Sequence, residues 1–243
     1  MSKTLICLLA LVWCVASNAG EYVGLSEQER KSILTAHSSI RKSVNPTASN
    51  MLMLNYSVEL EQQAAEYLKT CPLGKVNSAG AKATAVPGKT AYIDTSNTMT
   101  FEQIIAKFGE EKADYTYDSN TCKQDKTCMN YTQVVWAETN EVGCAKQECA
   151  IQNSESGGTG SGSFANGGDS AGGDTGVKTT QVVCYYTPAG NTEDAKPYKQ
   201  GTSCSECPNN FKCEENQCVN SAPTMLSAVA VLISALLTTQ CFA

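Results

Sequence analysis

Apolar residues recur at helical spacing in three stretches, each preceded by a residue that can cap a helix. Ser26 with Glu29 and Thr100 with Gln103 form capping boxes, and Ser57 precedes the stretch between them. The apolar faces are Ile33, His37, Ile40 and Val44 in the first stretch; Leu60, Ala64, Leu68 and Cys71 in the second; and Phe101, Ile104, Ile105 and Phe108 in the third. The pattern predicts three amphipathic helices, the second ending at Pro72, and a short fourth helix over 131–138.

Strands are predicted at 90–93, 142–145 and 179–186, which are rich in β-branched and aromatic residues. The chain is therefore expected to form an α+β domain with a small antiparallel sheet. The segment 152–178 interrupts this pattern, because it holds half of the 18 glycines and Phe164 is its only large apolar residue. Such a segment buries too little surface to offset its ordering entropy, so we expect a disordered insertion between two strands.

Both ends of the chain carry processing signals. Lys3, the apolar run 5–15 and small residues up to position 19 are typical of a secretory signal peptide, residues 1–19. Residues 221–243 form an uncharged hydrophobic tail after small residues, which suits a GPI-anchor attachment signal, although the usual polar spacer is nearly absent. A short hydrophobic tail without an anchor is the alternative. The expected product is extracellular, secreted or anchored at the cell surface.

The number of cysteines agrees with removal of the signal peptide and the tail. Of 13 cysteines, two lie in the leader and one in the tail. The even set that remains is Cys71, Cys122, Cys128, Cys144, Cys149, Cys184, Cys204, Cys207, Cys213 and Cys218. In an oxidising compartment these can form five disulfides, whose pairing the sequence leaves open. The last four belong to a cysteine-rich, hinge-like extension, residues 197–219, where structural disulfides are favoured over a redox or zinc half-motif.

Charge and histidine content exclude several functions. With 18 Lys and Arg against 24 Asp and Glu, the chain has no basic footprint for nucleic acid. The single histidine excludes a multi-histidine zinc site and leaves His37 as the sole imidazole for nucleophilic catalysis. Because His37 lies on the apolar face of the first helix, we expect a hydrogen-bonded core residue rather than a catalytic one.

Two segments carry a resemblance to a known family: Tyr-Thr-Gln-Val-Val-Trp at 131–136 and Val-Cys-Tyr-Tyr-Thr-Pro-Ala-Gly-Asn at 183–191. With further matches at 36–41, 46–52 and 197–204, the chain resembles the CAP superfamily of cysteine-rich secretory, antigen 5 and pathogenesis-related proteins, closest to its animal venom-allergen and cysteine-rich secretory branches. The resemblance implies a CAP domain over residues 26–190, an α-β-α sandwich with a central cleft.

Relatives commonly hold a divalent metal in that cleft with two His and two Glu. Here Asn130 stands where a His precedes Tyr-Thr-Gln, and Lys89 replaces an anionic ligand with a cation. Only one acid matches, Glu111, with Glu110 as the alternative. Zinc needs deprotonated donors, so the metal site is degenerate, and we expect no metal, no cofactor and no catalytic residue. A Lys89–Glu111 ion pair is the simplest expectation.

The fourth cleft position, a His after the second helix in relatives, falls at Lys75 or Asn77. Asn55 and Asn130 begin N-glycosylation sequons. At Asn130 the alternative to a glycan is a helix cap formed by the Asn130 side chain. In the Asn55 sequon the alternative is that Ser57 serves as a helix cap and not as part of a glycosylation site.

The resemblance favours a non-enzymatic binding or immunomodulatory protein whose partner at the host or cell surface is unknown. Some relatives bind sterols through the loop after the third helix, and some bind fatty acids between helices. Here that loop carries Tyr115 and Tyr117, with Cys122 and Cys128 positioned to close it. Aromatic rings suit a sterol face. The alternatives are a cleft protease, disfavoured by the missing histidines, and an ion-channel modulator, disfavoured because relatives with that activity carry a longer C-terminal cysteine domain.

Overall fold

The computed structural model describes residues 24–73, 88–150 and 178–220, so the leader, Lys75, Asn77, the insertion up to Val177 and the tail lie outside the described residues. The helices are α2 (Glu27–Arg41), α3 (Val58–Leu68), α4 (Phe101–Glu110), the 3-10 helix η1 (Glu111–Asp114) and α5 (Met129–Val134). The strands are β1 (Asn55–Tyr56), β2 (Lys89–Asp94), β3 (Tyr115–Thr116), β4 (Thr121–Cys122), β5 (Glu141–Ala150), β6 (Lys178–Thr187), β7 (Phe211–Glu214) and β8 (Gln217–Asn220).

The three long helices begin where their caps predict. Ser26 and Glu29 form a reciprocal capping box, as do Thr100 and Gln103, and Ser57 accepts from the Leu60 N–H. The fourth helix differs, because α5 begins at Met129 and ends at Val134 rather than running over 131–138. It ends early because the Ala137 N–H donates to the Pro197 carbonyl at 2.7 Å, which turns the backbone away from the helix.

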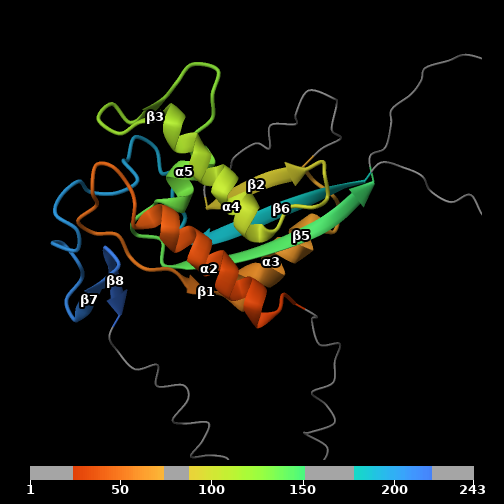
Figure 1. Ribbon diagram of the computed structural model, residues 1–243, viewed down its shortest axis with the longest axis horizontal. Coiled ribbons are helices and arrows are strands. Elements are labelled where there is room, and N and C mark those ends of the chain that lie inside the picture. Colours follow the sequence, from red (N-terminus) through yellow and green to blue (C-terminus); the bar gives the residue numbers. More distant parts are fainter. Residues whose placement is uncertain (1–23, 74–87, 151–177, 221–243) are drawn as a thin grey trace, which may run out of the picture.

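A four-stranded sheet runs in the order β1-β5-β6-β2 through the middle of the domain (Figure 1). Strands β5 and β6 pair over ten residues, and β2 pairs antiparallel with β6. The short edge strand β1 pairs parallel with β5, so the expectation of a wholly antiparallel sheet was wrong at that edge. The departure occurs because β1 leads into α3, which crosses behind the sheet (Figure 1).

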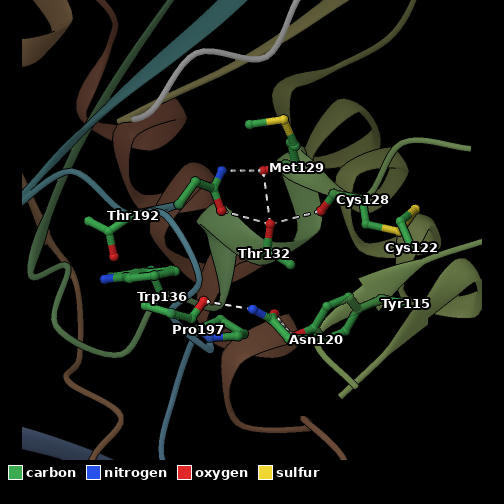
Figure 2. A pocket seen from close by; sticks show the side chains of 11 residues that line it. Tyr115, Asn120, Cys122, Cys128, Met129, Thr132, Trp136, Thr192 and Pro197 are labelled. Atoms are coloured by element: carbon green, nitrogen blue, oxygen red, sulfur yellow. Dashed lines mark hydrogen bonds between the residues drawn. A yellow bond between two sulfur atoms is a disulfide. The ribbon is translucent and has the colours of Figure 1, made fainter. Parts of the chain in front are cut away.

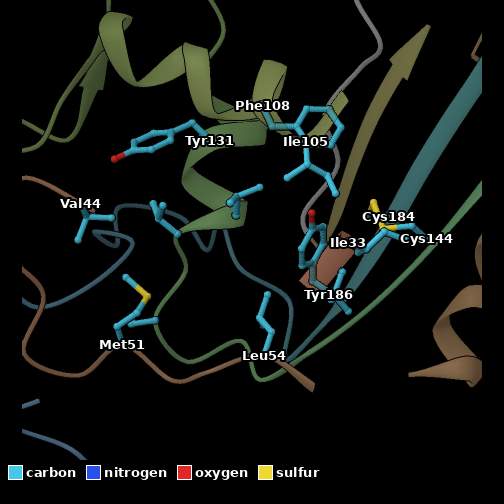
Figure 3. Packing of buried hydrophobic residues seen from close by; sticks show 14 of the residues in the cluster. Ile33, Val44, Met51, Leu54, Ile105, Phe108, Tyr131, Cys144, Cys184 and Tyr186 are labelled. Carbon is cyan, nitrogen blue, oxygen red and sulfur yellow. A yellow bond between two sulfur atoms is a disulfide. The ribbon is translucent and has the colours of Figure 1, made fainter. Parts of the chain in front are cut away.

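Alternating residues of β6 bury two opposite faces. Tyr186 and Cys184 belong to the larger core with Ile33 (Figure 3). Val183 belongs to a smaller core with Ala64 of α3. Helices α2, α4 and α5 cover the first face and α3 covers the second, so the α-β-α sandwich is confirmed.

One glycine sets how closely α3 approaches the sheet. A Cβ on Gly143 of β5 would lie 2.2 Å from the Glu61 nitrogen, so only glycine admits the helix at this distance.

All ten cysteines named above are paired. The bonds are Cys71–Cys149, Cys122–Cys128, Cys144–Cys184, Cys204–Cys213 and Cys207–Cys218. The expected closure of the 122–128 loop is confirmed, and so is the preference for disulfides over a redox or zinc motif in the extension. Each of the five bonds therefore adds a covalent tie to a small domain.

The cysteine-rich extension packs against the domain. Its β7–β8 hairpin is held at Cys218, whose N–H donates to the Met51 carbonyl at 2.7 Å and whose carbonyl accepts from Met53 at 3.0 Å. The neighbouring Gln217 is fully buried and donates to the Ser38 hydroxyl of α2 at 2.8 Å. The end of the extension is thus joined to α2 and to the strand-like segment after it.

Candidate functional site

The Glu111 carboxylate, which was expected in the cleft, caps the N-terminus of α5 although it lies about 20 residues earlier in the chain. Its Oε2 accepts from the backbone N–H groups of Asn130 and Tyr131, each at 3.0 Å. Its Oε1 accepts from Asn130 Nδ2 at 2.8 Å. Burial raises the pKa of the Glu111 carboxyl above its ordinary value, and these three donors only partly offset that rise. Glu110 is exposed and pairs with Lys107 instead.

Asn130 links this cap to the sheet. While Nδ2 donates to Glu111, Oδ1 accepts from the Ala91 N–H of β2 at 3.2 Å. Asn130 therefore lies within the first turn of α5 with both amide atoms engaged, and the alternative of a plain N-cap was wrong, because Cys128 is the N-cap residue. The position where relatives carry a His here joins α5 to β2.

Lys89 does not pair with Glu111, so the expected ion pair was wrong. The side chain of Lys89 is buried, and its Nζ lies 4.0 Å from the centroid of the Tyr67 ring on α3. Tyr67 in turn meets the Tyr185 ring edge-on. The Lys89 cation is therefore stabilised by an aromatic face on the α3 side of the sheet, away from the α5 cap.

His37 is a core residue, as expected. It is fully buried, with Nδ1 2.8 Å from the Ile33 carbonyl and Nε2 2.8 Å from the Tyr186 hydroxyl. Since a carbonyl only accepts, Nδ1 carries the proton and Nε2 accepts from Tyr186. Burial lowers the pKa of His37 to about 4, so the ring is neutral.

The residue Gln133, in the middle of the first resemblance segment, organises two loops. It is fully buried, and its Oε1 accepts from the N–H groups of Gly88 and Gly190, each at 3.0 Å. A Cβ on Gly190 would lie 2.6 Å from Trp136 Cγ, so the loop after β6 packs directly on the indole. The two segments that carry the resemblance are thus held against each other.

A hollow of about 200 Å³ lies beside the disulfide-closed loop (Figure 2). Its apolar lining comes from Tyr115, the Cys122–Cys128 bond, Met129, Trp136 and Pro197. The side chains of Tyr115, Asn120, Thr132 and Asn191 in its walls bond to one another and to the backbone. Tyr115 donates to Asn120 at 2.7 Å, and Asn120 donates to the Ala195 carbonyl at 3.1 Å. On the opposite wall Thr132 donates to Asn191 at 2.7 Å.

Tyr115 and Tyr117, both expected on the lipid-binding loop, line two different hollows. Tyr117, which lines the second of them, is buried, its ring stacks on Tyr198 at 4.7 Å between centroids, and its hydroxyl donates to the Tyr198 carbonyl. This second hollow, of about 480 Å³, shares Trp136 and Pro197 with the first. Tyr115 is only half-buried and remains on the first.

The sequons differ in accessibility. Asn55 is exposed on the edge strand β1, and its amide makes one 3.4 Å contact with the Asn140 carbonyl. The Ser57 hydroxyl caps α3, as the alternative expectation stated. Asn55 is nevertheless exposed to solvent. At Asn130 the same amide nitrogen is held by Glu111.

Comparison with known proteins places these features in a family. The model of the cysteine-rich secretory protein (CAP) family matches residues 34–186, which is more than half of the chain. The chain belongs to the CAP family. It is 28% identical over 217 residues to peptidase inhibitor 16 of Homo sapiens, covering 88% of this chain and 41% of that protein. It is 29% identical to human cysteine-rich secretory protein 2, covering 80% of this chain and 70% of that one.

Among solved structures, the hookworm platelet inhibitor superposes with a TM-score of 0.60 at 16% identity, covering 84% of this chain and 96% of that one. This likeness shows the fold. The CAP chain spans about two fifths of the length of peptidase inhibitor 16. Within the described residues, no helix is both long and apolar enough to cross a bilayer.

The residues of this CAP cleft do not fit a divalent metal. Both oxygens of Glu111 already accept hydrogen bonds from α5, and Asn130 offers an amide that is itself engaged. Lys89, at the third matched position, directs its side chain to Tyr67 on the α3 side of the sheet and offers no donor atom to a metal beside Glu111. Zinc requires several deprotonated nitrogen, sulfur or carboxylate donors. Glu111 and Asn130 instead form a hydrogen-bonded connection between α5 and β2, which we call the α5 joint.

The sequence patterns did not indicate a second important carboxylate, Glu61, which is buried. Glu61 of α3 accepts from Arg30 Nε at 2.9 Å, from Tyr56 Oη at 2.7 Å and from the Leu25 N–H at 2.9 Å. Burial opposes its charge, but these donors outweigh that penalty and hold the pKa of Glu61 below its ordinary value. The partners come from distant segments, and the only sequence signal is an acid beside Leu60 on the helix.

Arg41, at the end of α2, was missed as well. It is buried, and its guanidinium donates to backbone carbonyls, including Leu52 at 2.5 Å, Val134 at 2.8 Å and Trp136 at 2.7 Å. The match at 36–41 contains it, but the sequence does not show that its partners are carbonyls. Arg41 therefore fixes the turn after α5 on which the first hollow depends.

Proposed function

We propose that this CAP protein acts outside the cell as a non-catalytic binding module for a small apolar ligand of the sterol class, held in the hollow beside the 122–128 disulfide loop. One observation carries the proposal. The side chains of Tyr115, Asn120, Thr132 and Asn191 are satisfied by one another and by the backbone, so much of the surface facing the ligand is aromatic, disulfide and thioether. The Thr192 hydroxyl and the Trp136 indole N–H also line the hollow and can bond the few polar atoms of such a ligand. Rings with few free polar groups suit a flat, weakly polar molecule.

The size of the hollow constrains the mode of binding. Ligand pockets are usually about 300–1,000 Å³, so the first hollow alone, at about 200 Å³, accommodates part of a sterol. The second hollow adjoins it across Trp136 and Pro197. A sterol would place one end against Tyr115 and Met129 and extend along the indole toward Tyr117.

The cleft supports the non-catalytic half of the proposal. A general base must reach a substrate proton, and Glu111 is committed to three donors of α5. His37 is neutral and enclosed in the core. Peptide cleavage by the mature chain that is lost in Glu111→Gln would overturn this half and favour the protease alternative.

Trp136 provides the assay for ligand binding. The other tryptophan, Trp13, lies in the expected leader, so a chain expressed from residue 20 has Trp136 as its sole tryptophan. We expect saturable quenching or a spectral shift on titration with cholesterol, and weaker binding of a fatty acid of similar carbon number. Equal response to both would assign general lipid affinity, and no saturable response to the sterol would remove the proposal.

A matched pair of variants locates the site. Met129 is 37% exposed and lines the hollow, whereas Val58 is 42% exposed on the other side of the sheet at the start of α3. Met129→Glu should weaken sterol binding about tenfold or more, because a carboxylate replaces apolar contact. Val58→Glu should leave binding unchanged. Equal losses in both variants would place the ligand elsewhere.

A further inference from the structure

The four cysteines of the C-terminal extension lie close enough to form a second pairing. The Sγ atoms of Cys204, Cys207 and Cys218 lie within 4.8 Å of one another. They are joined as Cys204–Cys213 and Cys207–Cys218, so they are not thiolates available to a metal. Three sulfurs from two different disulfides therefore share one small volume.

The backbone brings the alternative partners together. Cys204 and Cys207 are the first and last residues of a turn, because the Cys207 N–H donates to the Cys204 carbonyl at 3.4 Å. Residues so placed have Cα atoms less than about 7 Å apart, which includes the range of disulfides. On the hairpin, Cys213 and Cys218 are directly opposite across β7 and β8.

The same domain already contains a disulfide between opposed strand residues. Cys144 and Cys184 are register partners on β5 and β6, and they are bonded with Cα atoms 4.0 Å apart. Cys213 and Cys218 have the same relationship on their hairpin. Both members of the alternative pairing, Cys204–Cys207 and Cys213–Cys218, are therefore within bonding reach without moving the hairpin strands apart.

We propose that this cluster is a thiol–disulfide exchange site, in which a small external thiol converts the observed pairing into Cys204–Cys207 and Cys213–Cys218. Cys213 is exposed, whereas Cys218 is buried at 1%. The incoming thiolate therefore attacks Cys213 Sγ, forming a mixed disulfide and releasing Cys204 as a thiolate. This is the only step that requires access from solvent.

Two further exchanges complete the conversion. The Cys204 thiolate attacks Cys207 Sγ, which forms the Cys204–Cys207 bond and releases Cys218 as a thiolate. Cys218 then attacks Cys213 Sγ, which forms the Cys213–Cys218 bond and releases the external thiol. The number of disulfides is unchanged, no net oxidation occurs, and the thiol acts as a catalyst.

The exchange changes what the disulfides hold. In the observed pairing both bonds tie the hairpin to the 204–207 turn, which is anchored on the domain by Glu206 and Ser49. In the alternative pairing each bond is internal to the turn or to the hairpin. The hairpin then depends on non-covalent contacts, among them Gln217 with Ser38 and the exposed Lys42–Glu215 ion pair. The consequence is a thiol-dependent loosening of the C-terminal segment.

Trypsin separates the two pairings directly. Lys199 and Lys212 flank the turn, and no Lys or Arg follows Lys212, so digestion gives one peptide with Cys204 and Cys207 and another with Cys213 and Cys218. In the observed pairing the two peptides stay linked. After exchange they separate, each with an internal disulfide. The experiment treats the mature chain with a glutathione buffer, quenches it in acid, blocks free thiols and maps the peptides by mass without reduction.

We expect time-dependent loss of the linked species and growth of the two internally bonded peptides. The Cys122–Cys128 bond of the same molecule is the internal control, since Lys123 and Lys126 lie between its cysteines and its peptides should stay linked. In C204S/C213S, which lacks the bond attacked first, Cys207–Cys218 should persist. Retention of the linked species alone, or release of peptides carrying only blocked free thiols, would overturn the proposal.

Discussion

The Tyr186 hydroxyl donates to His37 Nε2 at 2.8 Å inside the core, while the opposite ring nitrogen donates to the Ile33 carbonyl. Tyr186 uses its single hydrogen in this bond and accepts from the Thr90 hydroxyl at 3.1 Å. The chain of bonds joins α2 to β6 and β2. A second proton on Nε2 would reverse these donors and place a positive charge in the core, which burial opposes.

This arrangement predicts a pH-dependent stability. His37 has a pKa of about 4 when folded and an ordinary value of 6.5 when unfolded, so the unfolded chain binds the proton first. The stabilisation is complete above about pH 6.5 and is lost as the pH falls toward 4, by about 3 kcal/mol in total. Urea unfolding at pH 7 and pH 5 should show about 2 kcal/mol of this loss, because the folded protein is not yet protonated at pH 5.

The control for this prediction is His37→Gln, which should be less stable at pH 7 but should lack this component of the slope. Carboxylates with lowered pKa values, such as Glu61 and Asp94, also contribute to the free energy of unfolding, but that contribution is lost only as the pH falls through about 4 and below. An identical slope between pH 7 and 5 in both proteins would show that His37 does not titrate as described.

Local signals in the sequence predicted the elements that depend on neighbours in the chain. The capping boxes at Ser26 and Thr100 fixed the starts of α2 and α4, because both partners lie within four residues. The start of α5 was predicted two residues late, since its cap is Glu111, which lies about twenty residues upstream. No local pattern contains that information.

The candidate site was predictable in its residues but not in its contacts. Replacement of cleft ligands by Lys89 and Asn130 was visible, and it implied a degenerate metal site. The partners were not visible, because Lys89 meets Tyr67 across the sheet and Asn130 meets both Glu111 and Ala91. The resemblance assigns Lys89 and Glu111 to one cleft and so suggested an ion pair, but β2 directs Lys89 to the α3 side of the sheet.

Glycosylation should distinguish the two sequons. Asn55 is exposed on β1, so its amide can be modified, whereas Asn130 Nδ2 is bonded to Glu111 within the α5 joint. We expect Asn55→Gln to remove one glycan from the secreted protein and Asn130→Gln to remove none. Intact mass before and after peptide N-glycosidase treatment reads this out. A glycan lost in Asn130→Gln would show that the joint forms only after modification or not at all.

Zinc should not stabilise the domain. A ligand that binds only the folded state raises the melting temperature by an amount that grows with the logarithm of its concentration above Kd, and this cleft offers one carboxylate that is already engaged. Thermal unfolding of the chelator-treated mature chain should therefore be unchanged by added zinc. A rise in melting temperature that disappears in Glu111→Gln would restore the cation site to this cleft.

The Glu111–Asn130 joint predicts a specific rescue. Ala91 donates to Asn130 Oδ1, and Asn130 Nδ2 donates to Glu111, so position 111 must accept at both oxygens. Glu111→Gln introduces a second donor against Asn130 and should cost about 1–3 kcal/mol. Asn130→Asp places two carboxylates at the 2.8 Å contact and should also destabilise the domain at pH 7.

The double variant E111Q/N130D restores the order of donors with the charge moved from one position to the other. The introduced glutamine accepts from the two α5 N–H groups through its oxygen and donates through its amide to the introduced aspartate, which still accepts from Ala91. The stability of the double variant should exceed that predicted from the sum of the single variants by about 1–3 kcal/mol, measured by urea unfolding as a double-mutant cycle. Simple additivity would mean that Glu111 contributes only its charge to the α5 terminus. A coupling of the expected size would establish that Glu111 and Asn130 function as one hydrogen-bonded joint.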